Sequence, residues 1–183
     1  MKTIYILLTK SSTILSKMVG FITSDKYTHV SISFEASLQP MYSSSRKNGE
    51  TLFPAGPCME NFQRGYLKKH PFIPCALYEL EVSDEIFYSA KAEVEQIMNN
   101  VDDYSFNIIG LLLCRMNIPY HRKGHYFCSQ FVGEILYKSQ AVELPKDTSL
   151  MRPSDYMNIP ELVCHFNGRL NELLQRRANL IRV

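Results

Sequence analysis

The spacing of apolar and polar residues along the chain predicts five strands. Residues 3–9 are rich in strand-forming side chains, and residues 27–34 and 76–82 alternate between two faces. Shorter strands are predicted at 38–43 and 162–166, while 44–57 gather Ser, Asn, Gly and Pro as exposed loops do. Strands are therefore expected from the beginning of the chain to its last third.

Apolar residues three and four positions apart predict helices between and after these strands. One helix is capped by Ser11 or Ser12, and others cover 84–99 and 104–116, the latter expected to be buried. Another begins near Cys128, and 171–182 form a basic amphipathic helix. Strand and helix patterns thus mix along the whole chain.

Length and charge narrow the class of protein. A chain of 183 residues favours one folded domain, and 45% hydrophobic against 21% charged residues is typical of a globular protein. The 20 basic and 18 acidic residues are too evenly balanced to indicate a nucleic-acid or anionic-membrane partner. The longest apolar run, 108–114, is far shorter than the roughly 20 residues of a membrane-spanning helix. We expect no integral membrane segment.

The five cysteines show no paired spacing, so neither a disulfide framework nor a zinc knuckle is predicted. Free thiols are typical of reducing compartments. Because 1–10 do not form a proper signal peptide, we expect a cytoplasmic protein. Four of the cysteines are assigned to packing, and Cys128 is the exception.

Cys128 is expected in the first turn of its helix, where a cysteine side chain is well placed for nucleophilic chemistry. Unpaired backbone N–H groups and the positive end of the helix dipole favour a thiolate there, and a nearby imidazole can take the proton. His29 is the candidate imidazole. On its predicted strand, His29, Ser31 and Ser33 share one face, opposite the apolar residues. The two residues together suggest a nucleophile and its base.

Two short motifs around these residues carry a family resemblance. Residues 27–32 (YTHVSI) resemble the strand motif [ST]HV[GAS][IL], and 126–132 (YFCSQFV) resemble the helix-start motif [YF]xCS[EQ]xV. Both motifs are similar to those of the circularly permuted NlpC-type papain-like cysteine hydrolase superfamily, which includes YiiX-like proteins and is related to lecithin retinol acyltransferase. The resemblance spans 1–166 and leaves 167–183 as a C-terminal tail helix.

The resemblance implies an α+β, papain-like fold, in which a small antiparallel sheet or partial barrel packs against helices and His precedes Cys in the chain. It also implies a cysteine hydrolase or acyltransferase that acts on an amide or ester bond through a thioester, with no cofactor or metal. The expected substrate is small, and either peptide-like or an acyl compound. Neither its identity nor the oligomeric state is predicted.

The resemblance also suggests where further site residues lie. A polar residue on the strand after the His strand should orient the imidazole, and Gln39, Tyr42 and Ser43 are available there. We assign Tyr42 to this third position. The backbone N–H of Cys128 would stabilise an oxyanion, and Tyr126 and Ser129 are assigned to the same substrate region.

Three alternative interpretations of the sequence remain open. The domain could be a non-catalytic binding module, since no acid or amide is evident at the third position. It could handle acyl lipids, as the apolar helix at 104–116 would suit. His121, His125 and Cys128 could ligate a metal, but Pro119 and Gly124 indicate a loop without ligand spacing.

Overall fold

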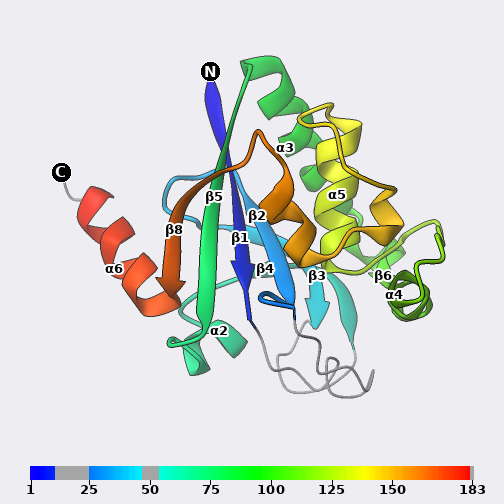
Figure 1. Ribbon diagram of the computed structural model, residues 1–183, viewed down its shortest axis with the longest axis horizontal. Coiled ribbons are helices and arrows are strands. Elements are labelled where there is room, and N and C mark those ends of the chain that lie inside the picture. Colours follow the sequence, from blue (N-terminus) through cyan, green and yellow to red (C-terminus); the bar gives the residue numbers. More distant parts are fainter. Residues whose placement is uncertain (11–24, 47–53, 182–183) are drawn as a thin grey trace.

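The structure is a computed structural model that describes residues 1–10, 25–46 and 54–181. Within these ranges, one antiparallel sheet of six strands forms the centre of the molecule, in the order β4-β3-β2-β1-β5-β8 (Figure 1). The strands are β1 (Lys2–Thr9), β2 (His29–Ser33), β3 (Met41–Arg46), β4 (Ala55–Glu60), β5 (Pro74–Val82) and β8 (Val163–Arg169). The fold class is α+β.

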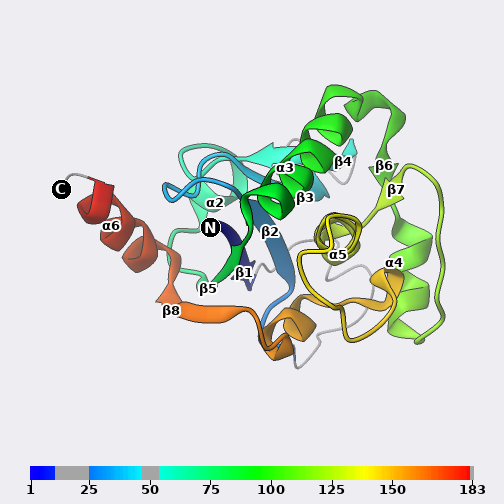
Figure 2. The ribbon, with the colours of Figure 1, turned by 90° about the horizontal axis from the view of Figure 1, so that it is seen from above.

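Helices lie on both sides of this sheet (Figure 2). They are α2 (Gly65–Lys69), α3 (Asp84–Asn99), α4 (Ile108–Arg115), α5 (Cys128–Lys138) and α6 (Leu170–Ile181), with short 3-10 turns at Val101–Asp103, Thr148–Leu150 and Pro153–Asn158. A small parallel pair, β6 (Ser105–Phe106) and β7 (His125–Tyr126), leads into α4 and α5. The segment immediately before Cys128 thus lies beside β4 of the main sheet.

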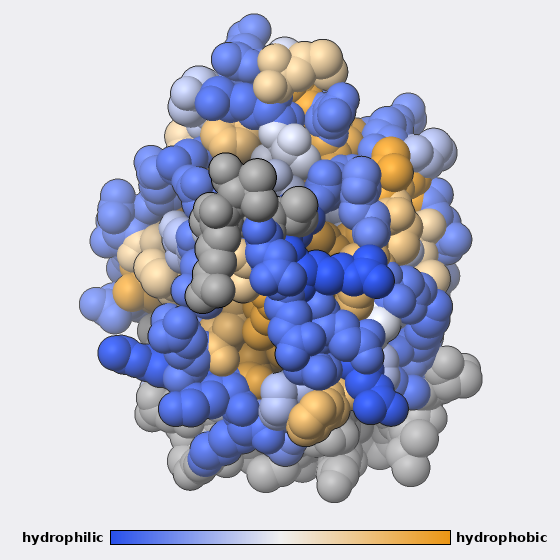
Figure 3. Space-filling view, turned by 90° about the vertical axis from the view of Figure 1, so that its left-hand side faces the viewer, coloured by the Kyte–Doolittle hydropathy of each residue, from blue (hydrophilic) through white to orange (hydrophobic). Residues whose placement is uncertain are grey.

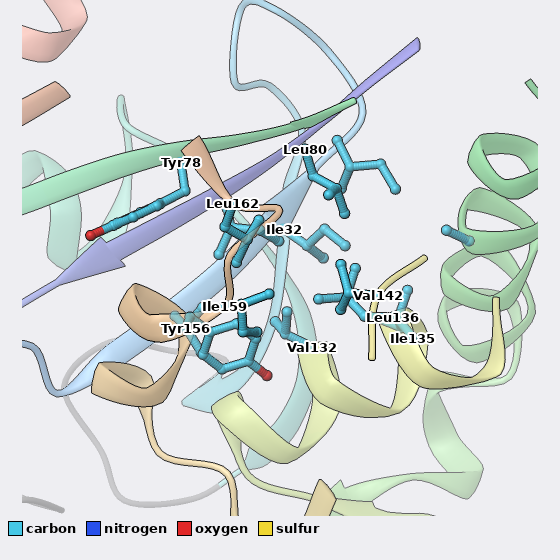
Figure 4. Packing of buried hydrophobic residues seen from close by; sticks show 14 of the residues in the cluster. Ile32, Tyr78, Leu80, Val132, Ile135, Leu136, Val142, Tyr156, Ile159 and Leu162 are labelled. Atoms are coloured by element: carbon cyan, nitrogen blue, oxygen red, sulfur yellow. The ribbon is translucent and has the colours of Figure 1, made fainter. Parts of the chain in front are cut away.

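Two buried clusters hold the layers together, because β1 carries apolar side chains on both of its faces. On one face, Ile4 and Ile6 pack with α3 and α5 in what we call the first cluster. Figure 4 shows part of it, where Val132 and Leu136 of α5 lie beside Ile32 of β2. The second cluster lies on the other face. It contains residues Tyr5, Leu7, Leu38, Met41, Phe62, Leu67, Cys75, Leu77, Phe166, Leu170 and Leu173.

The C-terminal segment belongs to the same folded unit. The expected boundary after residue 166 falls inside β8, which pairs with β5 as far as Arg169. Leu170 and Leu173 of α6 are buried in the second cluster. The side of the molecule that carries α6 is mainly hydrophilic at its surface (Figure 3), as expected for a helix whose apolar stripe is buried.

Four of the predicted strands occur with small changes at their ends, and one is displaced. The strand predicted at 38–43 begins at Met41, because Leu38 has a φ of 57° and Pro40 has no N–H for a ladder hydrogen bond. The loop predicted at 44–57 is too long at both ends, because β3 continues to Arg46 and β4 begins at Ala55, although Gly56 and Pro57 interrupt any strand pattern there. Strand β4 is the last strand on its side of the sheet, where proline is tolerated.

The helix prediction at 84–99 is confirmed as α3, whose N-cap Ser83 accepts a hydrogen bond from the Ile86 N–H at 3.3 Å. The prediction at 104–116 is too long, since Asn107 caps α4 by accepting from the Gly110 N–H at 2.9 Å. The helix predicted after Ser11 or Ser12 lies outside the described residues.

The expectation that the helix at 104–116 is buried is wrong. Ile109 is 51% exposed, Leu112 43% and Met116 67%. Only one side of the helix, with Gly110 and Cys114, is buried. No helix in the described ranges is both long and apolar enough to cross a membrane.

Candidate active site

His29 and Glu60 form a close ion pair at the ends of two strands. His29 is the first residue of β2 and Glu60 the last of β4, with β3 between them. The His29 Nε2 atom lies 2.7 Å from Glu60 Oε1, and the two side chains are only 14% and 13% exposed. Ser31 donates a hydrogen bond to the other carboxylate oxygen at 2.6 Å. Both carboxylate oxygens of Glu60 are therefore engaged.

The two charges stabilise each other. Burial by itself would lower the pKa of His29, but the Glu60 charge and hydrogen bonds with Cys128 and Glu60 raise it well above 6.5. Burial would raise the pKa of Glu60, yet the His29 charge and hydrogen bonds from His29, Ser31 and Ser45 lower it. Both shifts favour an imidazolium beside a carboxylate.

Cys128 completes the arrangement from a separate element. It is the first residue of α5, follows the extended residue Phe127, and its side chain is partly exposed. The helix packs against β2 and β3, and hydrogen bonding and charge from the Cys128 side chain are among the causes that raise the pKa of His29. Because Nε2 faces Glu60, Nδ1 is the ring nitrogen left for the sulfur. The structure thus brings together the two residues that the sequence paired.

Tyr42 does not occupy the third position, contrary to the assignment from the sequence. It pairs with Ile32 on the neighbouring strand, and its side chain packs against the first cluster. Burial raises the pKa of Tyr42, and Glu95 of α3 adds to this effect. The residue that contacts the imidazole is Glu60, one strand further along the sheet.

The other two assigned residues have different surroundings. Ser129 is buried, and its hydroxyl donates to the Met151 carbonyl at 2.7 Å, so it stabilises the fold and does not face a substrate. Tyr126 stacks on Tyr104 with ring centroids 6.0 Å apart, and burial raises the pKa of its phenol to about 12. The Tyr126 phenol therefore stays neutral beside the helix start.

The first turn of α5 offers backbone donors for an oxyanion. The first N–H groups of any helix have no partner within the helix, and that of Cys128 is one of them. The entry to this turn is held in place, because the Tyr126 carbonyl accepts hydrogen bonds from Ser44 Oγ at 2.6 Å and from the Asn107 N–H at 3.2 Å. Asn107 also donates to Gln130 at 3.1 Å. Helix α4 is thereby attached to α5.

Sequence reasoning missed Glu60 and the role of Ser31. The one available signal for Glu60 was its position two residues after Cys58, at the end of a loop-like segment. If these residues formed a strand, the two side chains would share one face. Cys58 was assigned to packing, and its sulfur lies 3.1 Å from Ser45 Oγ. Burial, together with the Glu60 charge, raises the pKa of Cys58 to about 11. Cys58 therefore stays a neutral thiol at physiological pH and is no competing nucleophile.

The two histidines of the 119–125 loop have separate partners. His121 Nε2 is 2.8 Å from Asp147 Oδ1, while His125 Nδ1 donates to the Lys123 carbonyl at 2.9 Å. Among the described residues, no group of three or more His, Cys, Asp or Glu side chains could hold a metal ion. The loop thus belongs to the surroundings of the site and not to its chemistry.

Comparisons with models of protein families, with curated proteins and with solved structures found no match. The function has therefore to be argued from the geometry of the site.

Proposed function

We propose that this protein is a cysteine-dependent hydrolase or acyltransferase of the permuted papain-like type, acting on an amide or ester bond. The Cys128 sulfur attacks the carbonyl carbon, and His29 gives a proton to the leaving group as the bond to it breaks. The product of this step is a thioester on Cys128. Water or another acceptor then loses a proton to His29, attacks the thioester and releases the sulfur.

The observation that carries this proposal is the His29–Glu60 pair at 2.7 Å, together with the influence of Cys128, by hydrogen bonding and charge, on the pKa of the same imidazole. A carboxylate that holds one nitrogen of the imidazole leaves the other directed at the nucleophile, which is the arrangement that thiol and serine hydrolases need. The non-catalytic interpretation was motivated by a missing acid or amide at the third position. Glu60 supplies that acid, so the reason for the non-catalytic interpretation no longer applies.

Selective alkylation of the cysteines tests the proposal. We expect iodoacetamide at neutral pH to modify Cys128 at least about ten times faster than Cys164, an exposed thiol of the same chain that serves as the internal reference. His29→Ala should abolish the difference. Peptide mass spectrometry resolves the two sites. If Cys128 reacts no faster than Cys164 and His29→Ala changes nothing, the proposal fails.

A second candidate function is the handling of acyl lipids, which one observation favours. Ile109, Leu112, Met116 and Ile118 are exposed on or just after α4, and we call this surface the α4 apolar face. Neighbouring exposed apolar side chains commonly mark a binding surface. Through Asn107, the same helix is bonded to Gln130, two residues from Cys128. An acyl chain bound on this face would lie on a helix that is hydrogen-bonded to α5.

A further inference from the structure

Ser31 lies between the two charged members of the site. Its Oγ is 2.6 Å from Glu60 Oε2 and 3.4 Å from His29 Nε2, and the residue is completely buried. A hydroxyl group has a single proton to donate. Because the ionised carboxylate takes this proton at the shorter distance, the Ser31 oxygen can only accept from Nε2–H. This arrangement requires that Nε2 carry a proton.

We propose that Ser31 is a positioning residue, which holds the Glu60 carboxylate against His29 Nε2 and so keeps Nδ1 directed at Cys128. The inference rests on the proposed function, since it concerns the orientation of the base in the same site. Ser31 acts through Glu60 and His29 and does not touch the substrate.

The neighbours of Glu60 show why Ser31 would matter. Ser45 is the other hydroxyl donor, but it reaches only Oε1, at 3.3 Å, and its Oγ also lies 3.1 Å from Cys58. Without Ser31, Oε2 would lose its short hydrogen bond in a buried setting, and the carboxylate could rotate away from the imidazole. The titratable groups that face this pair are Cys58 of β4 and Cys128 of α5.

The chain offers a closely matched control in Ser33. It lies two residues further along β2 on the same face, is equally buried, and donates to the Pro40 carbonyl at 2.8 Å instead of to Glu60. Ser31→Ala and Ser33→Ala therefore remove the same atom from the same face of the same strand. Only the first change affects the carboxylate.

The experiment measures two quantities in the wild type and both variants: the pH dependence of Cys128 alkylation, and the titration of His29 followed by NMR. In Ser31→Ala we expect alkylation about tenfold slower at neutral pH and a lower pH midpoint for His29, because the imidazolium loses its fixed counter-charge. Ser33→Ala should match the wild type in both. Thermal unfolding confirms that each variant is folded.

A double-mutant cycle keeps the test independent of general destabilisation. If Ser31 acts through Glu60, adding Ser31→Ala to Glu60→Gln should slow alkylation by less than about twofold further. Independent, multiplicative effects of the two changes would overturn the inference, as would a Ser31→Ala protein that behaves like Ser33→Ala. Both outcomes presuppose fast alkylation of wild-type Cys128. Slow alkylation in the wild type would instead overturn the proposed function, on which the inference rests.

Discussion

At the scale of single residues, the account depends on which group orients His29. A carboxylate at 2.7 Å stabilises the imidazolium far more than a neutral phenol could, and it does so in a setting that excludes most water. This explains why the pKa of His29 is raised although burial opposes the charge. Glu60, and not Tyr42, therefore sets the protonation of the base.

Replacing Glu60 tests this assignment. Glu60→Gln keeps the shape of the side chain but removes the negative charge, so the imidazolium becomes less favourable and the pKa of His29 should fall. The midpoint of the His29 ring signals in NMR measures the change.

Tyr42→Phe is the control for that titration, because it removes the hydroxyl of the residue first assigned to this position. Its side chain packs against the first cluster, and Glu60 holds the imidazole, so the midpoint should stay where it is in the wild type. A larger shift in Tyr42→Phe than in Glu60→Gln would return the third position to Tyr42.

At the scale of elements, the site depends on how α4 and α5 are joined. Asn107 caps α4 with its side-chain oxygen and donates from its amide nitrogen to Gln130 in α5. Gly110 is needed for this contact, because a Cβ there would lie 2.2 Å from the Asn107 amide nitrogen. The cap that starts α4 therefore also joins this helix to α5.

Substitution in α4 tests whether that face binds acyl chains. Leu112→Ser removes an exposed apolar side chain, so Cys128 should be acylated more slowly, by about tenfold, with a long-chain activated ester. Reaction with the acetyl ester should not change. Tyr137→Ser is the matched control, since Tyr137 is also exposed but lies near the far end of α5. Equal effects of Leu112→Ser on both esters, or an equal effect of Tyr137→Ser, would contradict the lipid interpretation.

At the scale of the whole molecule, local patterns predicted most strands and the helices at 84–99 and after Cys128. These segments carry regular apolar spacing and ordinary caps, such as Ser83. The pairing of Cys128 with His29 could be predicted because each lies in a motif of its own. The burial of α4 could not be predicted, since a run of apolar residues does not reveal which side has a partner.

The third member of the site was missed for a reason of topology. Glu60 is 31 residues from His29 along the chain, and only the order β4-β3-β2 brings the two together. A shift of one residue on β3 would have exchanged its two faces, and no local pattern fixed that register. The predicted boundary after residue 166 was likewise placed too early in the chain. Strand β8 pairs with β5 up to Arg169, and this is a long-range contact that no local pattern reveals.

Formation of a thioester on Cys128 is the most direct test of the central claim. When the protein reacts with an activated acetyl ester and is quenched in acid, peptide mass spectrometry should find the acetyl group on Cys128 and not on Cys164, and the label should disappear as the ester is consumed. His29→Ala should acquire far less label. Equal labelling of Cys128 and Cys164, unaffected by His29→Ala, would contradict the account.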